Sequence, residues 1–377
     1  MKKCVIFLLA MLAGAQGVSA DIWRVNNNAG VSRDFVSIQE AVIAASAGDT
    51  IHVEGSVTAY DASGVVVAKK GYIFGPGYHL TVNPETQHLK PSARVNSITF
   101  NAGSAGSVLA GIEQAETGGI SGTGFSVPVA NWVGPRLTIN ESNIRIVNCK
   151  LNWVDIKNDK NLTDIDIKKC WFCPGIVRST ATSEVLNLNL VNNFFRNDGT
   201  PTGSAYIVID LDANVKTNIG NNTFYGGFQI NARKNCHIYN NVFYATTNRV
   251  SAALTTDDTN TYRGNISNID PLGGIVNGQN RNTTRTGENT ETQANIWFSA
   301  SGGISTYDKY FQANSSAGSP IRQAATTAEV TGELGMFCGL SPYILSGMTN
   351  IPSVYEIVMP AEVSSDGFEV TVKVRAH

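Results

Sequence analysis

Four charged side chains in the middle of the chain are of the types that act on acidic polysaccharides. Asp210 and Asp212 lie two residues apart, and Lys157 and Arg233 stand in neighbouring segments that share a hydrophobic pattern. Removing the proton beside a uronic-acid carboxylate requires a cation that neutralises the carboxylate and a base that reaches the carbon-bound proton. These four residues are therefore the candidates for catalysis.

Hydrolysis of a glycosidic bond is the alternative chemistry, because it requires two carboxylates that flank the bond. Asp164 with Asp166, or Asp210 with Asp212, would supply such a pair. A plainer interpretation stays open for each of these residues. Outward Asp, Lys and Arg side chains on neighbouring strands often form only solvated surface pairs, which contribute little to stability and nothing to chemistry.

The strands that must position these residues are predicted by a repeat. One position of the repeat carries a cysteine or an asparagine and is preceded, three residues earlier, by an aliphatic residue. Its members are Cys149, Cys170, Asn193, Asn222 and Asn241, and the positions two residues later hold Leu151, Phe172, Phe195, Phe224 and Phe243. The intervals of 21, 23, 29 and 19 residues predict one coil per repeat, with turns of variable length. Stacked coils would align the first position into an inward ladder whose asparagine amides hydrogen-bond to one another.

Outward positions of the same strands form the candidate binding surface. Parallel strands hold polar groups in a flat, regularly spaced array, which suits an extended chain of sugars. Alternation along the strands places one outward row just before the ladder position and a second row on the following strand. The candidate binding residues in these two rows are Arg145, Asp166, Lys168, Asn231, His237 and Tyr239. In the second row, Lys157, Asp210 and Asn231 are expected to fall in line.

An amphipathic helix precedes the repeats. Residues 37–40 (SIQE) have the pattern of a capping box, and apolar residues recur at helical spacing from Ile38 to Ala45. Gly48 then ends the helix. Because an open stack of coils exposes unpaired strand edges and apolar core, we expect this helix to cap the N-terminal end of the stack.

Several of these segments carry a family resemblance. Residues 34–41 (DFVSIQEA) and 47–53 (AGDTIHV) resemble the N-terminal entry of secreted right-handed parallel β-helix proteins of the pectin-lyase-like superfamily. The Asn-Asn-x-Phe coils resemble the repeat of that superfamily, and residues 317–321 and 333–337 resemble its last coil. Arg322 stands where that coil usually has an aspartate, so the final coil departs from the pattern.

The resemblance covers roughly residues 23–340 and implies an all-β fold, a right-handed parallel β-helix. It does not select one activity, because the superfamily contains lyases, hydrolases and non-enzymes. In its lyases, acidic residues hold Ca²⁺ and an arginine or lysine is the base. The resemblance therefore implies Asp210 and Asp212 as Ca²⁺ ligands, with Lys157 or Arg233 as the base. Calcium normally takes more oxygen ligands than these two carboxylates provide.

The two ends of the chain carry different signals. Lys2 and Lys3 precede an apolar run and a small-residue site that ends at Ala20, which predicts a signal peptide over 1–20. We therefore expect a secreted, periplasmic or cell-surface protein without a transmembrane segment. The β-helix is expected over 21–340, followed by a C-terminal β-strand appendage over 341–377 with strands at 354–359 and 368–374.

The net charge argues against a nucleic-acid-binding protein, and the cysteine count predicts few or no disulfides. The chain has 28 Lys+Arg and 30 Asp+Glu, and loss of the two leader lysines would give 26 − 30 = −4. A weakly acidic protein lacks the clustered positive charge that nucleic acid requires. Five cysteines would remain after cleavage, and we expect core thiols or a single disulfide, including at Cys170 and Cys173.

Two hypotheses of function follow from these patterns. The first is a monomeric secreted or surface β-helix protein that binds a polysaccharide, with an acidic polymer as the candidate, and that cleaves it by β-elimination if it is an enzyme. The second is a non-catalytic structural or adhesive surface protein. A groove with at least three acidic side chains and a basic one would favour an enzyme, whereas a flat face with scattered charges would favour adhesion.

Overall fold

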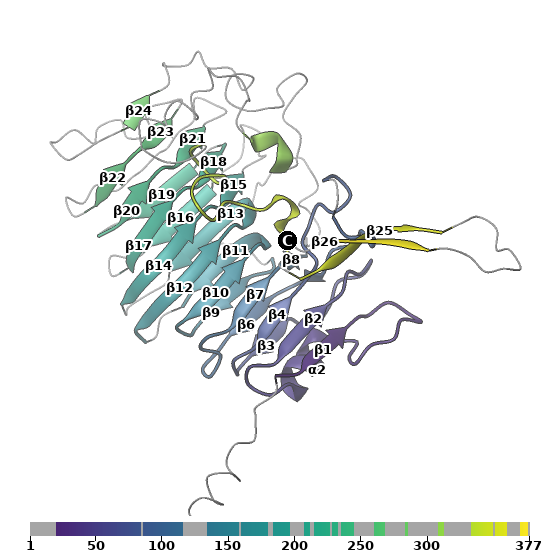
Figure 1. The fold of residues 1–377 in the computed structure, drawn as a ribbon. Helices are drawn as coiled ribbons and strands as arrows, with labels where there is room; N and C mark the ends of the chain where they lie inside the picture. The colour runs from purple at the N-terminus through teal and green to yellow at the C-terminus, as the bar shows by residue number, and fades with distance from the viewer. Residues whose placement is uncertain are drawn as a thin grey trace, which may run out of the picture.

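Two long parallel β-sheets make up most of the molecule, and the chain passes alternately from one to the other (Figure 1). The computed structural model describes residues 20–83, 86–115, 134–157, 160–179, 184–196, 207–211, 215–226, 228–232, 235–244, 260–267, 283–285, 308–312, 333–349, 351–359 and 370–375. Within each sheet, strands pair with those of the neighbouring coils, where a coil is one strand of the first sheet together with the strand or strands of the second sheet that follow it. The all-β class predicted from the sequence is confirmed.

The first sheet, sheet A, has ten strands among the described residues and carries the first outward row. In order these are β1 Ile22–Val25, β2 Thr50–Val53, β4 Tyr72–Phe74, β7 Val108–Ala110, β10 Ile144–Val147, β12 Leu162–Lys168, β14 Val185–Val191, β17 Val215–Gly220, β20 His237–Tyr239 and β22 Thr261–Arg263.

The second sheet, sheet B, carries the second outward row. Its main path runs through β3 Val65–Val67, β6 Ile98–Phe100, β9 Leu137–Ile139, β11 Lys150–Ile156, β13 Trp171–Ser179, β15 Phe194–Arg196, β18 Thr223–Tyr225, β21 Val242–Tyr244, β23 Asn265–Ser267 and β24 Thr283–Arg285. Beside this path lie β5 Arg94–Val95, β8 Glu113–Gln114, β16 Ile207–Leu211 and β19 Phe228–Ala232.

The predicted inward ladder is confirmed. Asn193, Asn222 and Asn241 are completely buried, and each backbone N–H in the series donates to the side-chain oxygen of the next coil's asparagine. The Asn222 amide also donates to the carbonyl of Leu190 at 2.8 Å. Asn265 extends the ladder by one coil, since its Oδ1 accepts from Asn241. Burial of these amides is therefore compensated by hydrogen bonds along the stack.

The aromatic ladder two residues later is also confirmed. The rings of Phe172, Phe195, Phe224 and Phe243 stack in order, with centroids 4.6, 4.8 and 4.8 Å apart. These separations match the spacing of neighbouring strands, so each coil adds one ring to a continuous interior column. The column belongs to the main apolar core between the two sheets.

The residue before each ladder position makes the turn between the sheets. The five residues at this position all have positive φ angles, from 53° to 57°: Asn148, Lys169, Asn192, Asn221 and Asn240. Asparagine tolerates this left-handed conformation better than most residues. The recurring Asn-Asn pair therefore combines a turn residue with a buried ladder residue.

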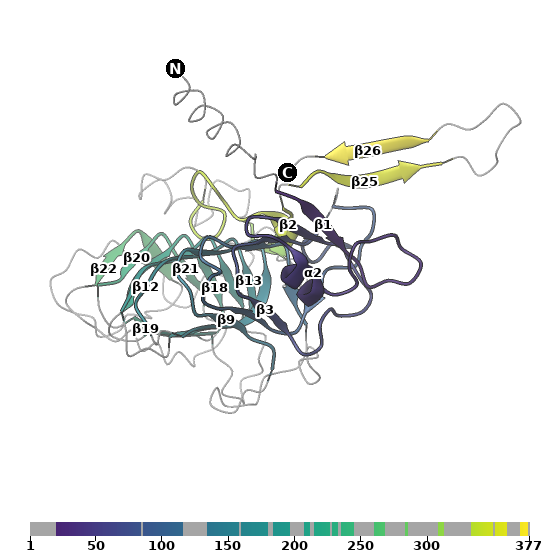
Figure 2. The same cartoon turned by 90° about the horizontal axis from the view of Figure 1, so that it is seen from below.

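One helix lies at the N-terminal end of the stack (Figure 2). Helix α2 spans Ile38–Ala44 and packs against β1, β2 and β3. The Ser37 side chain accepts from the Glu40 N–H, as the sequence predicts. Asp61 completes the helix start, because its carboxylate accepts from the Ser37 hydroxyl and from the Ile38 N–H.

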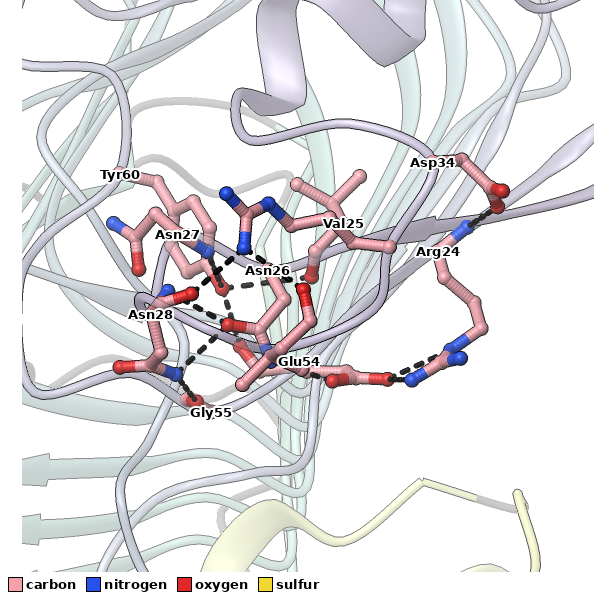
Figure 3. A network of polar contacts seen from close by, with 11 residues as sticks. Arg24, Val25, Asn26, Asn27, Asn28, Asp34, Glu54, Gly55 and Tyr60 are labelled. Carbon is pink, nitrogen blue, oxygen red and sulfur yellow. Dashed lines mark hydrogen bonds and ion pairs between the residues drawn. The ribbon is translucent and has the colours of Figure 1, made fainter.

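A polar network ties together the first two coils beside this helix (Figure 3). The carboxylate of Glu54 accepts from the Arg24 guanidinium at 2.5 Å and from the Asn26 amide at 2.6 Å. The Tyr60 hydroxyl donates to the carbonyl of Glu54 at 2.8 Å. This network fixes the chain where it leaves β1 and β2.

After the coils, the chain returns along one flank of the stack. We call residues 333–349 the strap. It follows the 3₁₀ helix η2 (Asp308–Phe311), contains η3 (Leu345–Gly347) and covers a second apolar core formed with outward residues of sheet B. That core consists of Tyr78, Trp171, Phe194, Tyr225, Val242, Tyr244, Phe311, Leu334, Met336 and Tyr343.

The C-terminal strands form an antiparallel hairpin, β25 Ser353–Val358 and β26 Thr371–Arg375, which projects from the N-terminal half of the molecule (Figures 1 and 2). The sequence places these two strands within a few residues of their observed bounds. Within the described residues, no helix is long and apolar enough to cross a membrane. The predicted signal peptide, residues 1–20, lies almost entirely outside the described residues.

The cysteines at the ladder positions are core thiols. Cys149 and Cys170 are completely buried, and each thiol donates to a backbone carbonyl of its own coil at 3.3 Å. Burial and the neighbouring Cys149 raise the pKa of Cys170 well above its ordinary value. The structure forms no disulfide between described residues, so Cys170 and Cys173 are not bonded to each other.

Candidate functional site

The outward face of sheet A carries a straight row of polar side chains. Strand register places Arg145, Asp166, Asn189, Asn218 and His237 opposite one another on five consecutive strands, β10, β12, β14, β17 and β20. We call these five residues the sheet A row. The sequence predicts this alignment, because period-2 alternation turns the residue four positions before each ladder residue outward.

Side-chain contacts hold the middle of the row in place. The Asn189 amide donates to Asp166 Oδ1 at 2.8 Å, and the Asn218 amide donates to Asn189 Oδ1 at 2.7 Å. At the far end, His237 Nδ1 lies 2.6 Å from the hydroxyl oxygen of Thr261 on β22. Each side chain is thus oriented by its neighbour on an adjacent coil.

The cationic end of the row carries more positive than negative charge. Asp166 lies between Arg145, with Nε at 3.7 Å, and Lys168, with Nζ at 3.0 Å. The Arg145 side chain is 63 % exposed and that of Lys168 37 % exposed, against 18 % for Asp166. Both cations therefore present donors to solvent beyond those that face the carboxylate.

Tyr239 lies in the next outward position of β20, in line with Lys168 and Gly220. A Cβ atom on Gly220 would come within 2.1 Å of the Tyr239 ring, so only glycine fits beneath it. Burial raises the pKa of the Tyr239 hydroxyl. The phenol end of the Tyr239 ring thus lies over Gly220, beside the row.

The second outward row, on sheet B, differs from the prediction in one member. Register aligns Asp155, Arg178, Asp210 and Asn231, so Asp210 and Asn231 are in line as expected. Lys157 is not in this row, because it lies two residues beyond Asp155 on the same stretch of chain. A shift of two residues leaves every inward side chain inward, so alternation could not distinguish the two registers.

A charged cluster surrounds Trp153 at the start of this row. Asp155 accepts from the Trp153 indole N–H at 2.6 Å and from the Arg136 guanidinium at 3.1 Å. The Arg136 and Arg178 guanidinium carbons lie 4.4 and 5.9 Å from the Trp153 ring centre. Arg178 Nε also lies 4.0 Å from a carboxylate oxygen of Asp210.

The sequence did not identify Arg136, Trp153, Asp155 or Arg178 as site residues. Arg136 lies 13 residues before Cys149, the first recognised ladder position, in a segment that precedes the recognised repeats. Strand β13 contains two more residues than β11 between their paired positions, which hides the correspondence of Asp155 with Arg178. A repeat search that allowed for this insertion would align them, because Val154 and Val177 are both inward.

The predicted calcium site is incomplete within the part of the chain that the structure describes. Asp212 and Arg233 lie outside the described residues, as does the side chain of Asn231. Among the described residues, no three His, Cys, Asp or Glu side chains are close enough together to hold a metal ion. Asp155 and Asp210 both face arginines, so the described carboxylates of this row fit ion pairing better than Ca²⁺ coordination.

Comparison with known proteins assigns no family. No family model, no curated protein and no solved structure matches the chain. The function of the chain is therefore inferred from the residues on the two outward faces.

Proposed function

We propose that this protein is a secreted or surface-exposed right-handed parallel β-helix protein, of the pectin-lyase-like type, that binds an extended acidic polysaccharide along sheet A. The observation that carries the proposal is the sheet A row, five polar side chains in register on consecutive strands. With strands about 4.8 Å apart, the row is roughly 19 Å long, enough for several sugar units in line.

The row suits a polymer because its side chains are already ordered. Asp166, Asn189 and Asn218 are hydrogen-bonded to one another, so binding would cost little side-chain entropy. Amide, carboxylate and imidazole groups offer both donors and acceptors to sugar hydroxyls. The flat ring of Tyr239 adds an apolar surface beside them.

The preference for an acidic polymer follows from Arg145 and Lys168. Two exposed cations flank one partly covered carboxylate, which leaves a net positive charge at this end of the row. A guanidinium is well shaped for a sugar carboxylate, because it donates two parallel hydrogen bonds. Such binding should weaken as salt screens the charges.

Affinity electrophoresis and calorimetry with polygalacturonate, alginate and a neutral glucan test the proposal. We expect the two polyuronates to bind and the neutral glucan to bind more weakly. Replacing both Arg145 and Lys168 by alanine should weaken polyuronate binding about tenfold or more, whereas Lys373→Ala, which removes a cation from the C-terminal hairpin, should have no effect. Binding to none of these polymers, or equal loss in both variants, would contradict the proposal and favour a structural or adhesive protein.

A second candidate function is cleavage of the same polymer on sheet B. It is favoured by Arg178, which lies between the carboxylates of Asp155 and Asp210 in one row. A lyase would produce unsaturated uronates, which absorb ultraviolet light. Loss of that absorbance on Arg178→Gln, with binding retained, would support cleavage. Binding without any such product would leave the protein as a binding protein.

A further inference from the structure

The outward face of sheet A continues from the sheet A row toward the first coils. A second line of outward positions lies beside the row and runs from β12 back to β1. Strand register aligns its members in the order Lys168, Val147, Ala110, Phe74, His52 and Arg24. With strands about 4.8 Å apart, Lys168 and His52 lie roughly 19 Å from each other along this line. The line therefore joins the cationic end of the row to the N-terminal end of the stack.

Between the charged ends of this line, the face is apolar. Val147 and Phe74 are partly exposed. Val108 and Tyr72, which continue the register of Arg145 on the same strands of sheet A, are also partly exposed. A sugar chain presents apolar C–H surfaces as well as hydroxyl groups, so it gains from contact with such side chains. The face thus offers a polymer a path beyond the sheet A row.

The line ends in a cavity of about 420 Å³ between the first coils and the base of the C-terminal hairpin. We call it the hairpin cavity. Arg24 and His52 line it from sheet A, His88 lines it from the segment between β4 and β5, and Ile357 lines it from β25. The His88 backbone N–H donates to the carbonyl of Val354 at 2.7 Å, which attaches this wall to the hairpin. The volume is in the range of sites that bind small molecules.

Polar groups in the wall of the hairpin cavity are available to a ligand. Arg24 donates to Glu54 with Nε and Nη2 (Figure 3), and its Nη1 has no hydrogen bond to any described residue. The imidazoles of His52 and His88 make no hydrogen bond within the part of the chain that the structure describes. Burial lowers the pKa of His52, so its ring is neutral at pH 7 and offers one donor and one acceptor.

We propose that the hairpin cavity binds the terminal units of the acidic polysaccharide that lies along sheet A. This inference rests on the proposed function and adds to it the recognition of a chain end. Arg24 Nη1 donates to the carboxylate of a terminal uronate, and the two imidazoles exchange hydrogen bonds with its hydroxyl groups. The aliphatic wall, which includes Ile357, packs against the C–H surface of the sugar.

A chain end fits this place better than the middle of a chain. Strand β1 is the first strand of sheet A, and both views place the base of the hairpin beside β1 and β2 (Figures 1 and 2). A polymer that follows the sheet toward β1 therefore meets a wall made by the hairpin and residues 87–89. Lys168 and Arg24 lie at the two ends of one apolar path, which suits a polymer with several carboxylates better than a single small molecule.

Calorimetric titration with short and long fractions of polygalacturonate and of alginate tests the inference. If the cavity binds a chain end, each chain takes up one protein molecule whatever its length, so the binding capacity per uronate unit is higher for the short fraction. The same capacity per uronate unit in both fractions would overturn the inference and leave the proposed function intact. Binding of neither polymer would contradict the proposed function, and the inference with it.

Two substitutions on opposite walls test the cavity itself. His52→Phe keeps a ring but removes its hydrogen-bonding groups, and Ile357→Trp fills the cavity from the hairpin. Each should weaken binding of the short fraction about tenfold. Lys90→Ala is the matched control, because it removes a cation beside residues 87–89 but outside the cavity lining, and it should leave the affinity unchanged.

Unchanged affinity in both cavity variants, or an equal loss in Lys90→Ala, would overturn the inference. His52 lies on β2 and Ile357 on β25, so a folding defect in one variant leaves the other as a test. Loss of binding in the variant that lacks Arg145 and Lys168, with the short fraction still bound in proportion to its ends, would assign the end site to the cavity alone.

Discussion

Asn192 and Asn193 are neighbours in the chain, yet their side chains bind on opposite sides of the same strand turn. Asn192 has a φ of 57°, and its amide donates to the carbonyls of Met336 and Cys338 in the strap. Asn193 points into the core, where its amide donates to Ile167 and to Asn222. Asn148 also binds the strap, as Asn192 does, because its amide donates to the carbonyl of Met348. The Asn-Asn pair therefore joins the strap to the interior ladder.

Replacing Asn222 by alanine should destabilise the protein strongly. The substitution leaves the Asn193 N–H and the Leu190 carbonyl buried without their partner and opens a small cavity. We expect a loss of about 3 kcal/mol in the free energy of unfolding, measured by urea denaturation. Asn218→Ala, on the exposed sheet A row, should cost about 0.5 kcal/mol or less. Similar costs for both would show that the ladder does not stabilise the stack.

Substitutions of Asn192 should separate its contribution to the left-handed turn from its hydrogen bonds to the strap. Asn192→Gly removes the amide that donates to the strap but still accepts the left-handed turn conformation. Asn192→Ala removes the amide as well and disfavours that conformation. We expect faster hydrogen exchange in residues 333–349 for both variants, and an additional loss of about 1 kcal/mol in global stability for alanine alone. If strap exchange does not change in either variant, the amide contacts to Met336 and Cys338 do not hold the strap.

Removing only one charge of the Glu113–Lys150 pair should lower the free energy of unfolding. Both side chains are 13 % exposed, and their charged atoms lie 2.6 Å apart. Burial acts to raise the pKa of Glu113, but the Lys150 ammonium and hydrogen bonds from Lys150 and Ser92 outweigh it and lower the pKa. Lys150→Met should therefore destabilise by about 3 kcal/mol at pH 7.

The matched control for this pair is Lys150→Met combined with Glu113→Gln, which should recover most of the loss because no charge is left buried. The lowered pKa of Glu113 means that the pair stabilises the fold above pH 4.5, and that this contribution disappears as pH falls through the folded-state pKa. The difference between wild type and Lys150→Met should shrink accordingly in acid. A difference that is constant with pH would exclude this account.

His79 should make the protein less stable in mild acid. Burial and then the Lys150 charge lower the pKa of His79 from 6.5 to about 4. Between these values the unfolded chain takes up a proton and the folded chain does not, so stability falls as pH drops from 6.5 to 4, by up to about 3 kcal/mol.

The substitution His79→Asn tests this assignment, because asparagine accepts the φ of 50° at this position. Thermal unfolding followed across this pH range should be flatter for His79→Asn than for wild type. Asn218→Ala, which changes no titratable group, is the control and should leave the pH dependence as it is. An unchanged slope in His79→Asn would assign the acid sensitivity to another group.

Local pattern was enough to predict the parts of the fold that repeat. The ladder from Cys149 to Asn241, the phenylalanine column and the alignment of Arg145 with Asp166 were all predicted correctly. Each depends on period-2 alternation next to a recognisable reference residue, so a single coil contains the necessary information.

The sequence pattern did not predict contacts correctly where the register between neighbouring coils changes. Lys157 was expected beside Asp210, but a two-residue insertion in β13 places Asp155 in that row. Arg136 and Trp153 were missed because their contact joins strand β11 to a segment that precedes the recognised repeats. The return of the strap to Tyr78, whose hydroxyl contacts that of Tyr343, joins residues 265 positions apart.

The sequence by itself determined which side chains face the interior and which face solvent, because that choice is made by alternation within each strand. Only the tertiary structure decided which outward residues meet, since the lengths of the turns set the register of one coil on the next. It also decided that the turn asparagines hold a strap, because hydrogen bonds between segments so distant in the chain leave no local pattern.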